Sequence, residues 1–470
     1  MGQSMIVVVN PYSGAVVGQV PAGTAADVNI AVGQAREGAE VMRKMPLYRR
    51  AEILAATGQI LLRRAESLAQ LITAEAGKTI REARAEALRG AGIFQLAAEE
   101  TRRLHGETVP FDALPNGEGR TGYWTRVPLG VVGAITPWNV PLALAAHKIA
   151  PALGGGNAVV FKPAEQTPLI ALRLVEAMRE AGLPEKALVC VTGDGAIVGD
   201  ALVTHPDVAL LSFTGSREVG LKLPGRAGYK RVALELGGNC PVIITPTADL
   251  ATAAEAIVRG GFAVAGQLCI SVQRVLVHTS VLEALTAELL PRIRALRLGD
   301  PMEESTDVGT LIDPEARERV ADAVRAAKQL GATVLIGGER VGRSSYAPTL
   351  LKEVDPTSTL AREEAFAPLL LLMPYRALDE AITLANATPY GLNAGIYTND
   401  LQEALRAAEE IDAGAVMVND VPTFRSDLMP YGGRKQSGLG REGVRFALQE
   451  MTEPKLVCFR SLPPRDESPQ

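Results

Sequence analysis

The spacing of apolar and polar residues changes partway along the chain. In the first part, apolar residues recur with helical spacing over residues 26–45, 48–77 and 79–104, with few glycines or prolines inside. A short apolar run at 6–9 leads into the turn-forming residues 10–14. We therefore expect this part to form one strand followed by three amphipathic helices. The polar, β-prone stretch 117–127 then interrupts the helical pattern.

Short apolar runs, each ending in a polar or glycine-rich turn, alternate with helical segments in the next part of the chain. They span residues 131–135, 158–161, 187–191, 209–213 and 231–235. Strands that alternate with helices indicate βαβ units and a doubly wound parallel sheet, whose ligands bind outside the carboxyl ends of the strands. A second alternating set, from Pro241 to about Met417, predicts a second α/β domain.

Composition narrows the classes of protein and of partner. A chain of 470 residues exceeds one ordinary domain, and 47% hydrophobic with 21% charged residues is typical of a globular enzyme. The net charge of −5 gives no basic surface for nucleic acid or anionic membrane. No apolar stretch reaches the ~20 residues of a membrane span, and the start lacks the pattern of a signal peptide. We therefore expect a cytoplasmic protein without nucleic-acid or membrane partners.

The four cysteines and four histidines are scattered, which fits neither a disulfide framework nor a metal site. We expect no metal. One cysteine, Cys269, differs from the rest because it lies in the small, polar run 266–271. Cys190, Cys240 and Cys458 are interpreted as packing residues, the usual role of a buried thiol.

Glu235 lies in a Glu-Leu-Gly-Gly-Asn turn 34 positions before Cys269 (269 − 235 = 34). A thiol nucleophile forms an acyl-enzyme, and a carboxylate acting as a base activates the water that hydrolyses it. The two residues therefore supply both parts of a covalent mechanism.

The Glu-Leu-Gly-Gly-Asn turn followed by Gly-Gln-x-Cys at this spacing resembles the aldehyde dehydrogenase superfamily. The resemblance extends from Asn10-Pro11 to Glu453-Pro454-Lys455, nearly the whole chain. It implies oxidation of an aldehyde to the carboxylic acid with NAD, or alternatively NADP, in a homodimer or homotetramer. It also implies two doubly wound α/β domains with a small β oligomerisation element. The expected division is an NAD-binding domain (1–113 and 129–238), a catalytic domain (239–435) and an oligomerisation element (114–128 and 436–470).

The resemblance assigns catalytic roles to four residues. Cys269 is the nucleophile, Glu235 activates water, and the Asn139 side chain forms an oxyanion hole with the Cys269 backbone N–H. Lys148 matches a lysine of the family's proton relay. The alternatives are that Asn139 caps the helix that follows it and that Lys148 is a surface lysine.

No Gly-x-Gly-x-x-Gly follows a strand, so the cofactor residues also rest on the resemblance. They are Trp138, Lys162, Glu165, Gly195, Gly215, Ser216, Leu236, Glu364 and Phe366. Glu165 at the adenosine ribose favours NAD, because a carboxylate repels a 2′-phosphate. The alternative for Lys162 and Glu165 is a solvated pair in a loop.

Five residues are expected in the substrate pocket, with Val140 and Leu144 as further lining. They are Arg89, His147, Leu268, Ile270 and Arg425. Arginine at 425 and 89 suits an anionic tail, and the alternative is that both are ordinary salt-bridged arginines. We expect a small aldehyde, such as a semialdehyde or lactaldehyde.

Two other functions remain open at this stage. A coenzyme A-acylating dehydrogenase of the same family is one, although such relatives typically lack the glutamate at 235. A non-catalytic binding protein on the same scaffold is the other, since folds are reused.

Overall fold

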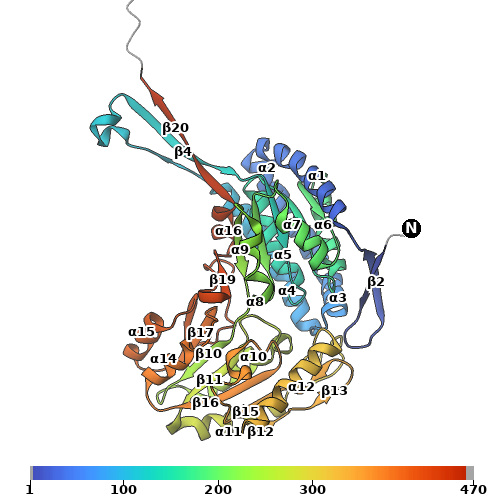
Figure 1. Cartoon of the computed structure of the whole chain (residues 1–470), viewed down its shortest axis with the longest axis vertical. Helices are drawn as coiled ribbons and strands as arrows, with labels where there is room; N and C mark the ends of the chain where they lie inside the picture. Colours follow the sequence, from blue (N-terminus) through green and yellow to red (C-terminus); the bar gives the residue numbers. More distant parts are fainter. Residues whose placement is uncertain (1–3, 462–470) are drawn as a thin grey trace, which may run out of the picture.

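The computed structural model describes residues 4–461, which form two lobes and an extended arm (Figure 1). The first lobe, blue to green in the figure, contains a six-stranded sheet, and the second, yellow to orange, a seven-stranded sheet. Each sheet is parallel except for one antiparallel edge strand. The predicted fold class, two doubly wound α/β units, is confirmed.

The six-stranded sheet has the order β19-β9-β8-β5-β6-β7. Its strands are β5 (Val131–Ile135), β6 (Ala158–Lys162), β7 (Leu188–Cys190), β8 (Leu210–Thr214), β9 (Arg231–Glu235) and β19 (Gly438–Leu439). All five strands predicted between 131 and 235 are present. Every residue of β5 and β6 is buried, because helices cover both faces of the sheet.

Two hydrophobic clusters lie on the two faces of this sheet. Along β5, Val132 and Ala134 point into one cluster while Val131 and Ile135 point into the other, as strand alternation requires. The first cluster is covered by α2 (Leu47–Arg63), α3 (Ala65–Ala76), α4 (Ile80–Arg102), α5 (Pro141–Gly154), α6 (Pro168–Glu180) and α16 (Val444–Glu450). The second is covered mainly by α1 (Ala25–Lys44), α7 (Asp200–Thr204) and α9 (Leu223–Ala227), with α8 (Arg217–Gly220) following β8.

The single helix predicted over residues 48–77 is wrong in one respect, because the structure divides it at Arg64 into α2 and α3. A straight helix of that length would extend about 45 Å. The break lets both halves pack on α4. No glycine or proline marks the position, so the cause is tertiary packing.

Two buried glutamates hold the helices behind the six-stranded sheet. Glu86 on α4 accepts hydrogen bonds from the backbone N–H groups of Leu142 and Ala143, in the first turn of α5, and pairs with Lys78 at 2.6 Å. Glu75 on α3 accepts from two N–H groups in the first turn of α6. Carboxylates in these places satisfy orphan donors and suit the positive end of a helix.

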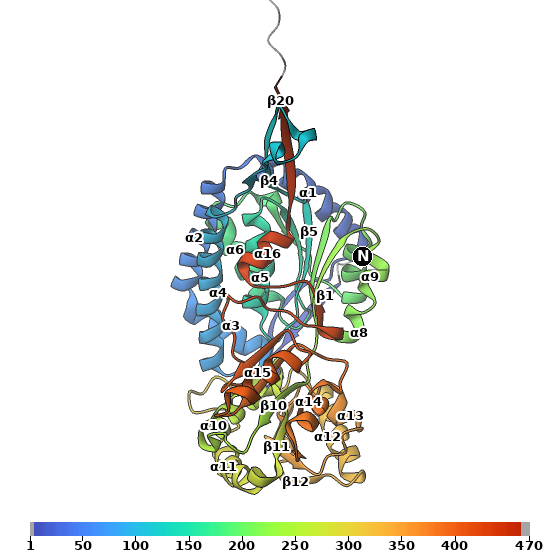
Figure 2. The same cartoon turned by 90° about the vertical axis from the view of Figure 1, so that its left-hand side faces the viewer.

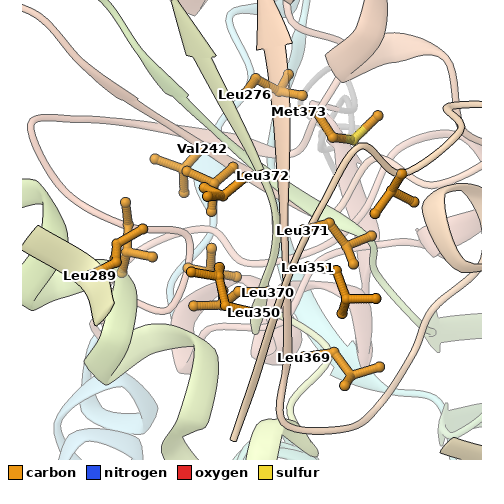
Figure 3. Close-up of a cluster of buried hydrophobic side chains, with 14 of the residues drawn as sticks. Val242, Leu276, Leu289, Leu350, Leu351, Leu369, Leu370, Leu371, Leu372 and Met373 are labelled. Atoms are coloured by element: carbon orange, nitrogen blue, oxygen red, sulfur yellow. The ribbon is translucent and has the colours of Figure 1, made fainter. Parts of the chain in front are cut away.

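The second lobe is built on the order β12-β15-β16-β11-β10-β17-β18. Its strands are β10 (Cys240–Ile244), β11 (Val272–His278), β12 (Thr333–Ile336), β15 (Thr349–Lys352), β16 (Leu369–Tyr375), β17 (Asn393–Tyr397) and β18 (Ala415–Val418). Its helices are α10 (Leu250–Phe262), α11 (Leu282–Arg294), α12 (Pro314–Gln329), α13 (Thr359–Arg362), α14 (Leu378–Asn386) and α15 (Leu401–Glu410). Figure 3 shows the core, where leucines of β15 and β16 pack on both faces of the sheet.

The arm is formed by β4 (Arg120–Pro128), which pairs with β20 (Thr452–Arg460) on one edge and β3 (Glu107–Thr108) on the other. It projects away from the second lobe (Figures 1 and 2). Cys458 lies exposed on β20, so the prediction that it packs in a core is wrong. The structure places 438–439 in the six-stranded sheet and α16 against α4 and α5, and the arm itself resumes at Thr452. The expected domain boundaries remain a prediction, and residues 462–470 lie outside the described residues.

Two small hairpins complete the fold: β1 (Met5–Val9) with β2 (Val16–Pro21), and β13 (Arg340–Val341) with β14 (Ser345–Tyr346). Within residues 4–461, no helix combines the length and apolar character that crossing a membrane requires.

Candidate active site

The loop that carries Cys269 lies between α10 and β11 in an uncommon backbone conformation. Val264, Ala265 and Gly266 have φ angles of 51°, 54° and 72°, all in the left-handed region. Glycine is required at 266 because a Cβ there would lie 2.0 Å from the carbonyl oxygen of Ala367. Left-handed conformations at non-glycine residues cost about 1–3 kcal/mol each, so other contacts must hold this loop.

Two polar side chains supply those contacts. Glu82 on α4 accepts a hydrogen bond from the N–H of Val264 at 2.6 Å. Gln267 donates to the carbonyls of Val264 and Thr310, both at 3.1 Å, and accepts from the N–H of Ile312 at 3.0 Å. The loop is therefore fastened to both lobes, which fixes the position of the cysteine that follows.

The Cys269 thiol is partly exposed, and its Sγ lies 3.1 Å from the hydroxyl oxygen of Tyr431. Burial raises the pKa of Cys269 to about 12; the hydrogen bond with Tyr431 acts in the opposite direction, and Glu364 and Glu235 add to the rise. A thiol with such a pKa is almost wholly protonated at neutral pH. Nucleophilic attack therefore requires groups that favour the thiolate.

Asn139 follows β5 and is buried. Its Nδ2 donates to the carbonyl oxygen of Gln267 at 2.8 Å, which fixes the orientation of the amide. One N–H of Nδ2 is thus used and the second is free, while Oδ1 has no hydrogen-bond partner among the described residues. Val140 is the N-cap residue of α5, and no side chain caps that helix, so the alternative that Asn139 is a cap is wrong.

Glu235 ends β9 with its carboxyl group buried. Its Oε1 lies against Gly432, because a Cβ added to that glycine would be 2.9 Å from this oxygen. Its Oε2 has no hydrogen-bond partner within residues 4–461. Burial raises the pKa of Glu235 well above its usual value, the charge of Glu442 adds to the rise, and Lys148 opposes it. A carboxylate with a raised pKa is a stronger base than an exposed glutamate, as activation of water requires.

Glu442 connects two buried cations beside Glu235. Its Oε1 accepts from Lys148 Nζ at 3.0 Å and its Oε2 from Arg425 at 2.9 Å, while Lys148 also donates to Ser212. Burial acts to raise the pKa of Glu442, but the two cations outweigh it and hold that pKa well below the usual range. A cavity of about 10 Å³ between Glu235, Lys148 and Glu442 has the volume that one water molecule needs. Lys148 is buried, so the surface alternative is wrong.

Arg425 lies with its guanidinium carbon 3.6 Å from the centre of the Tyr431 ring. Its side chain is 7% exposed, and Nε has no hydrogen-bond partner in the described part of the chain. The pair with Glu442 is the salt-bridged alternative foreseen from the sequence. Its role toward an anionic tail stays a prediction.

Arg89 and His147 meet at a different carboxylate, that of Asp427. Arg89 donates to both carboxylate oxygens, its shortest contact being 2.6 Å, and His147 Nε2 lies 2.9 Å from Oδ1. His147 is buried, and burial lowers its pKa. The two predicted pocket residues are therefore neighbours, joined by a residue that the sequence analysis did not single out.

The first group of predicted cofactor residues meets beyond the carboxyl ends of β6 and β7. Lys162 Nζ donates to Glu165 Oε1 at 2.6 Å; the lysine side chain is 4% exposed and the glutamate side chain 35%. Gly195 lies beside this pair, because a Cβ added to it would be 3.7 Å from Glu165 Oε1 and 3.9 Å from Lys162 Nζ. Lys162 is thus a buried cation held against an accessible carboxylate, and the solvated-pair alternative does not describe it.

A second group follows β8 and β9. The N–H of Gly215 donates to the carbonyl of Glu235 at 3.1 Å, and Ser216 is the N-cap residue of α8. Leu236 is buried under α8, since a Cβ at Gly220 would lie 2.1 Å from its side chain. These residues adjoin Glu235, so the predicted cofactor and catalytic residues share one edge of the sheet.

The third group crosses between the lobes. Trp138 and Phe366 pack edge to face, with ring centres 5.6 Å apart. Glu364 accepts a hydrogen bond from the N–H of Gly238 at 3.0 Å, and burial raises its pKa to about 8. Trp138 comes from the first lobe and Phe366 from the second, which places both beside the gap where Asn139 and Cys269 lie.

Apolar residues surround the thiol. Leu268 and Ile270 belong to one cluster with Cys240, Leu392 and Tyr431. Leu144 is buried on α5, and Val140 packs against the first-lobe helices. The predicted pocket residues on either side of Cys269 thus form one apolar cluster with Tyr431.

Tyr431, Glu442 and Asp427, which touch predicted site residues, were not assigned roles from the sequence. All three lie between β18 and α16, in loops on either side of the short strand β19. Glycines with positive φ flank two of them, since Tyr431 precedes Gly432 and Glu442 lies between Gly440 and Gly443. The contacts of these three residues to Cys269, Lys148 and Arg89 span hundreds of positions, so local spacing gives no warning of them.

Known proteins resemble this chain over nearly its whole length. The model of the aldehyde dehydrogenase family matches residues 1–457. An aspartate-semialdehyde dehydrogenase from Pseudomonas canavaninivorans is 46% identical over 97% of each chain. A 3-sulfolactaldehyde dehydrogenase from Priestia aryabhattai is 44% identical over 96% of this chain and 94% of its own, and a lactaldehyde dehydrogenase from Methanocaldococcus jannaschii is 39% identical over 96% of each.

A solved structure agrees in fold. The glyceraldehyde-3-phosphate dehydrogenase from Methanocaldococcus jannaschii, complexed with NADP, superposes with a TM-score of 0.94 at 38% identity, covering 98% of this chain and 100% of its own. The predicted enzyme class, an NAD(P)-dependent aldehyde dehydrogenase, is confirmed. The chain belongs to the aldehyde dehydrogenase family.

Proposed function

We propose that this protein oxidises a short aldehyde to its carboxylic acid with NAD or NADP, through a thioester on Cys269 that water hydrolyses. The single observation that carries the proposal is the convergence of three segments on one thiol. Asn139 follows β5 and binds the Cys269 loop, Glu235 ends β9, and Tyr431 reaches Sγ from the segment after β18.

Each side chain has a distinct task in this reaction. The Cys269 thiolate attacks the aldehyde carbon, and the carbonyl oxygen becomes an oxyanion. The free N–H of Asn139 Nδ2 donates to that oxyanion together with the Cys269 backbone N–H. When bound, the nicotinamide cofactor supplies the acceptor for the hydride that leaves the carbon.

Glu235 acts in the second half of the reaction. Its unpartnered Oε2 accepts a proton from the water that attacks the thioester. The Glu442–Lys148 pair beside it keeps a positive charge close to the ionised form of Glu235. The presence of this carboxylate favours hydrolysis over transfer of the acyl group to coenzyme A.

The residues at the carboxyl edge of the six-stranded sheet fit a dinucleotide. The exposed carboxylate oxygen of Glu165 suits the ribose hydroxyls, and Lys162 beside it balances its charge. Gly195 and Gly215 leave room for the backbone to approach phosphates. Glu364, at the end near Cys269, suits the hydroxyls of the second ribose. We propose NAD as the preferred cofactor because of Glu165, with NADP accepted through Lys162.

The test is initial NADH formation with an aldehyde substrate. Replacing Cys269 by serine should reduce the rate to background, whereas Cys458→Ser, on the exposed arm, serves as the matched control and should keep it. If Cys269→Ser retained a substantial part of the wild-type rate, the assignment of the nucleophile would be refuted.

For the substrate we propose an aldehyde with an anionic tail. Two buried cations, Lys148 and Arg425, share the single carboxylate of Glu442, and Arg425 Nε has no hydrogen-bond partner within residues 4–461. Arg425 therefore keeps a donor that the carboxylate or sulfonate group of a substrate tail would accept from. Arg89, on the far side of His147, is the second candidate contact. Semialdehyde and sulfolactaldehyde substrates in the names of relatives support this class, and the lactaldehyde relative supports a short chain.

Succinic semialdehyde and butanal, which both have four carbons, separate charge from length. We expect a higher kcat/KM for the semialdehyde than for butanal. Arg425→Gln should lower the kcat/KM for the semialdehyde roughly 10–100-fold, as expected for loss of a hydrogen bond to a charged group. The rate with butanal in the same variant controls for indirect effects on the thiol. Equal losses for both aldehydes would contradict the anchor role.

We also propose that the arm assembles copies of this chain. Tyr123, Leu456 and Phe459 are large apolar side chains exposed on β4 and β20. Such a patch on a projecting ribbon is typical of a contact surface. Light scattering of the intact protein should give the mass of a dimer or tetramer, and a monomer at micromolar concentration would exclude this role.

A further inference from the structure

Tyr431 is the polar group closest to the thiol. Its side chain is 2% exposed, and its hydroxyl lies 3.1 Å from Cys269 Sγ. Within residues 4–461, this is the only hydrogen bond of that hydroxyl, and Sγ has no other partner. The hydroxyl is therefore committed to the reacting atom, although the phenol ring packs in a largely apolar cluster.

The ring of Tyr431 is held from two directions. Its backbone exchanges two hydrogen bonds with the backbone of Glu442, at 3.0 and 2.6 Å. The Arg425 guanidinium stacks 3.6 Å from the ring centre and is itself held by the Glu442 carboxylate at 2.9 Å. One residue, Glu442, thus fixes both the backbone of the tyrosine and the cation over its ring. This arrangement leaves the hydroxyl little freedom to turn away from Sγ.

The thiolate in this pocket needs a donor. Apolar residues pack around it, and the nearby carboxyl groups of Glu364 and Glu235 disfavour a further negative charge, while the Arg425 cation favours it. A phenol O–H donates a hydrogen bond to a thiolate, and the cation on its ring makes it a better donor. Burial raises the pKa of Tyr431 well above its usual value, so the proton stays on the phenol oxygen throughout.

We propose that Tyr431 is a catalytic residue whose hydroxyl donates a hydrogen bond to the Cys269 thiolate, with Arg425 as the positioning residue that holds its ring. The role rests on the proposed function of Cys269 as nucleophile. It does not involve proton transfer from the tyrosine, because the thiol proton leaves to solvent or to Glu235. It explains how a half-buried thiol, which has no histidine partner within residues 4–461, reaches its reactive form.

The test is the pH dependence of alkylation of Cys269 by iodoacetamide, followed on the Cys269 peptide by mass spectrometry. Tyr431→Phe keeps the ring and removes only the donor, so it should lower the alkylation rate at pH 8 roughly 10–100-fold and move the profile to higher pH. Tyr375→Phe is the matched control: Tyr375 is also 2% exposed, but it donates to the Ile244 carbonyl inside the second lobe. Its profile should equal that of the wild type.

Arg425→Lys should shift the same profile in the same direction by a smaller amount, because the cation is retained but the flat stack is lost. An unchanged profile in Tyr431→Phe, with an unfolding temperature equal to that of the wild type, would overturn the proposal. Alkylation needs no turnover, so this result is separate from the fate of the proposed function. The latter fails if Cys269→Ser remains active.

Discussion

Buried polar side chains behind the six-stranded sheet differ from those beside Cys269 in how completely they are partnered. Glu86 accepts two backbone hydrogen bonds and pairs with Lys78, and Asn157 makes four hydrogen bonds, two at Oδ1 and two at Nδ2. By contrast, within the described part of the chain Glu235 has an unpartnered Oε2, and Asn139 an unpartnered Oδ1 and a free N–H.

Burial is similar in the two regions, so exposure does not explain the difference. Glu86 is 4% exposed and Glu235 6%, and Asn157 and Asn139 are 0% and 5%. Leaving a buried polar atom without a partner costs about 1–3 kcal/mol, which a purely structural position would not retain. In these two matched pairs, the residue that builds the fold has its hydrogen bonds completed, and the residue beside Cys269 keeps open ones for substrate or water.

The largest effect on stability should come from replacing a buried residue whose hydrogen bonds are all made. Glu86→Gln leaves Lys78 without its carboxylate in a site where both side chains are at most 3% exposed, so we expect the free energy of unfolding to fall by about 3–5 kcal/mol. Urea unfolding measures it. Glu235→Gln is the paired variant, and it should leave stability unchanged or raise it, because a neutral amide replaces an unpaired buried acid. Equal destabilisation by both would break the comparison.

Replacing two buried asparagines, one in each region, should separate effects on kcat from effects on the stability of the fold. Asn139→Ala should lower kcat roughly 10²–10³-fold through loss of the oxyanion donor, while removing only one hydrogen bond of the folded protein. Asn157→Ala removes four hydrogen bonds and should act on the unfolding temperature instead, with kcat per folded enzyme close to wild type. Steady-state kinetics and thermal unfolding of both variants give the answer. A large loss of kcat in Asn157→Ala alone would reverse our assignment.

A smaller, pH-dependent effect is expected at Glu75, which has two backbone donors but no cation. Burial raises its pKa to about 7, whereas in the unfolded chain the value is near 4.5. Since the folded pKa is the higher, its contribution to stability is fully present below pH 4.5 and is lost as pH rises through 7.

Glu75→Gln removes that titration. When the pH rises from 5 to 7.5, the free energy of unfolding of the wild type should therefore fall by roughly 2 kcal/mol relative to that of the variant. Urea unfolding at both pH values measures the shift, and all other titrating groups cancel in the difference. A shift of the opposite sign would mean that Glu75 is ionised and stabilised by its two donors.

The strands and most helices were predictable because burial on both faces leaves plain apolar runs. β5 and β9 have the predicted bounds, since β5 ends just before Thr136 and β9 ends at Glu235. The break at Arg64 was not, because it arises from packing on α4 and not from a local breaker. The left-handed turn at Val264 and Ala265 could not be foreseen either, since apolar residues rarely adopt it and distant side chains hold it.

The candidate site divides in the same way. Cys269 and Glu235 lie in short motifs with a fixed spacing, and the structure brings Asn139 to the same loop. Tyr431, which touches Sγ, is 162 positions from Cys269 and lies in a segment without regular structure. The ion-pair partners of Arg89 and Arg425 could not be predicted either, because their carboxylates come close only in the folded chain.

The most direct test of the account is the fate of the acyl group in Glu235→Gln. After mixing with aldehyde and NAD, we predict a burst of about one NADH per subunit and then a stall, with the acyl mass on the Cys269 peptide after acid quench. The wild type should turn over steadily with little acyl-enzyme. Steady hydrolysis by the variant without a trapped acyl group would contradict the role of Glu235, and release only on addition of coenzyme A in the wild type would favour the acylating alternative.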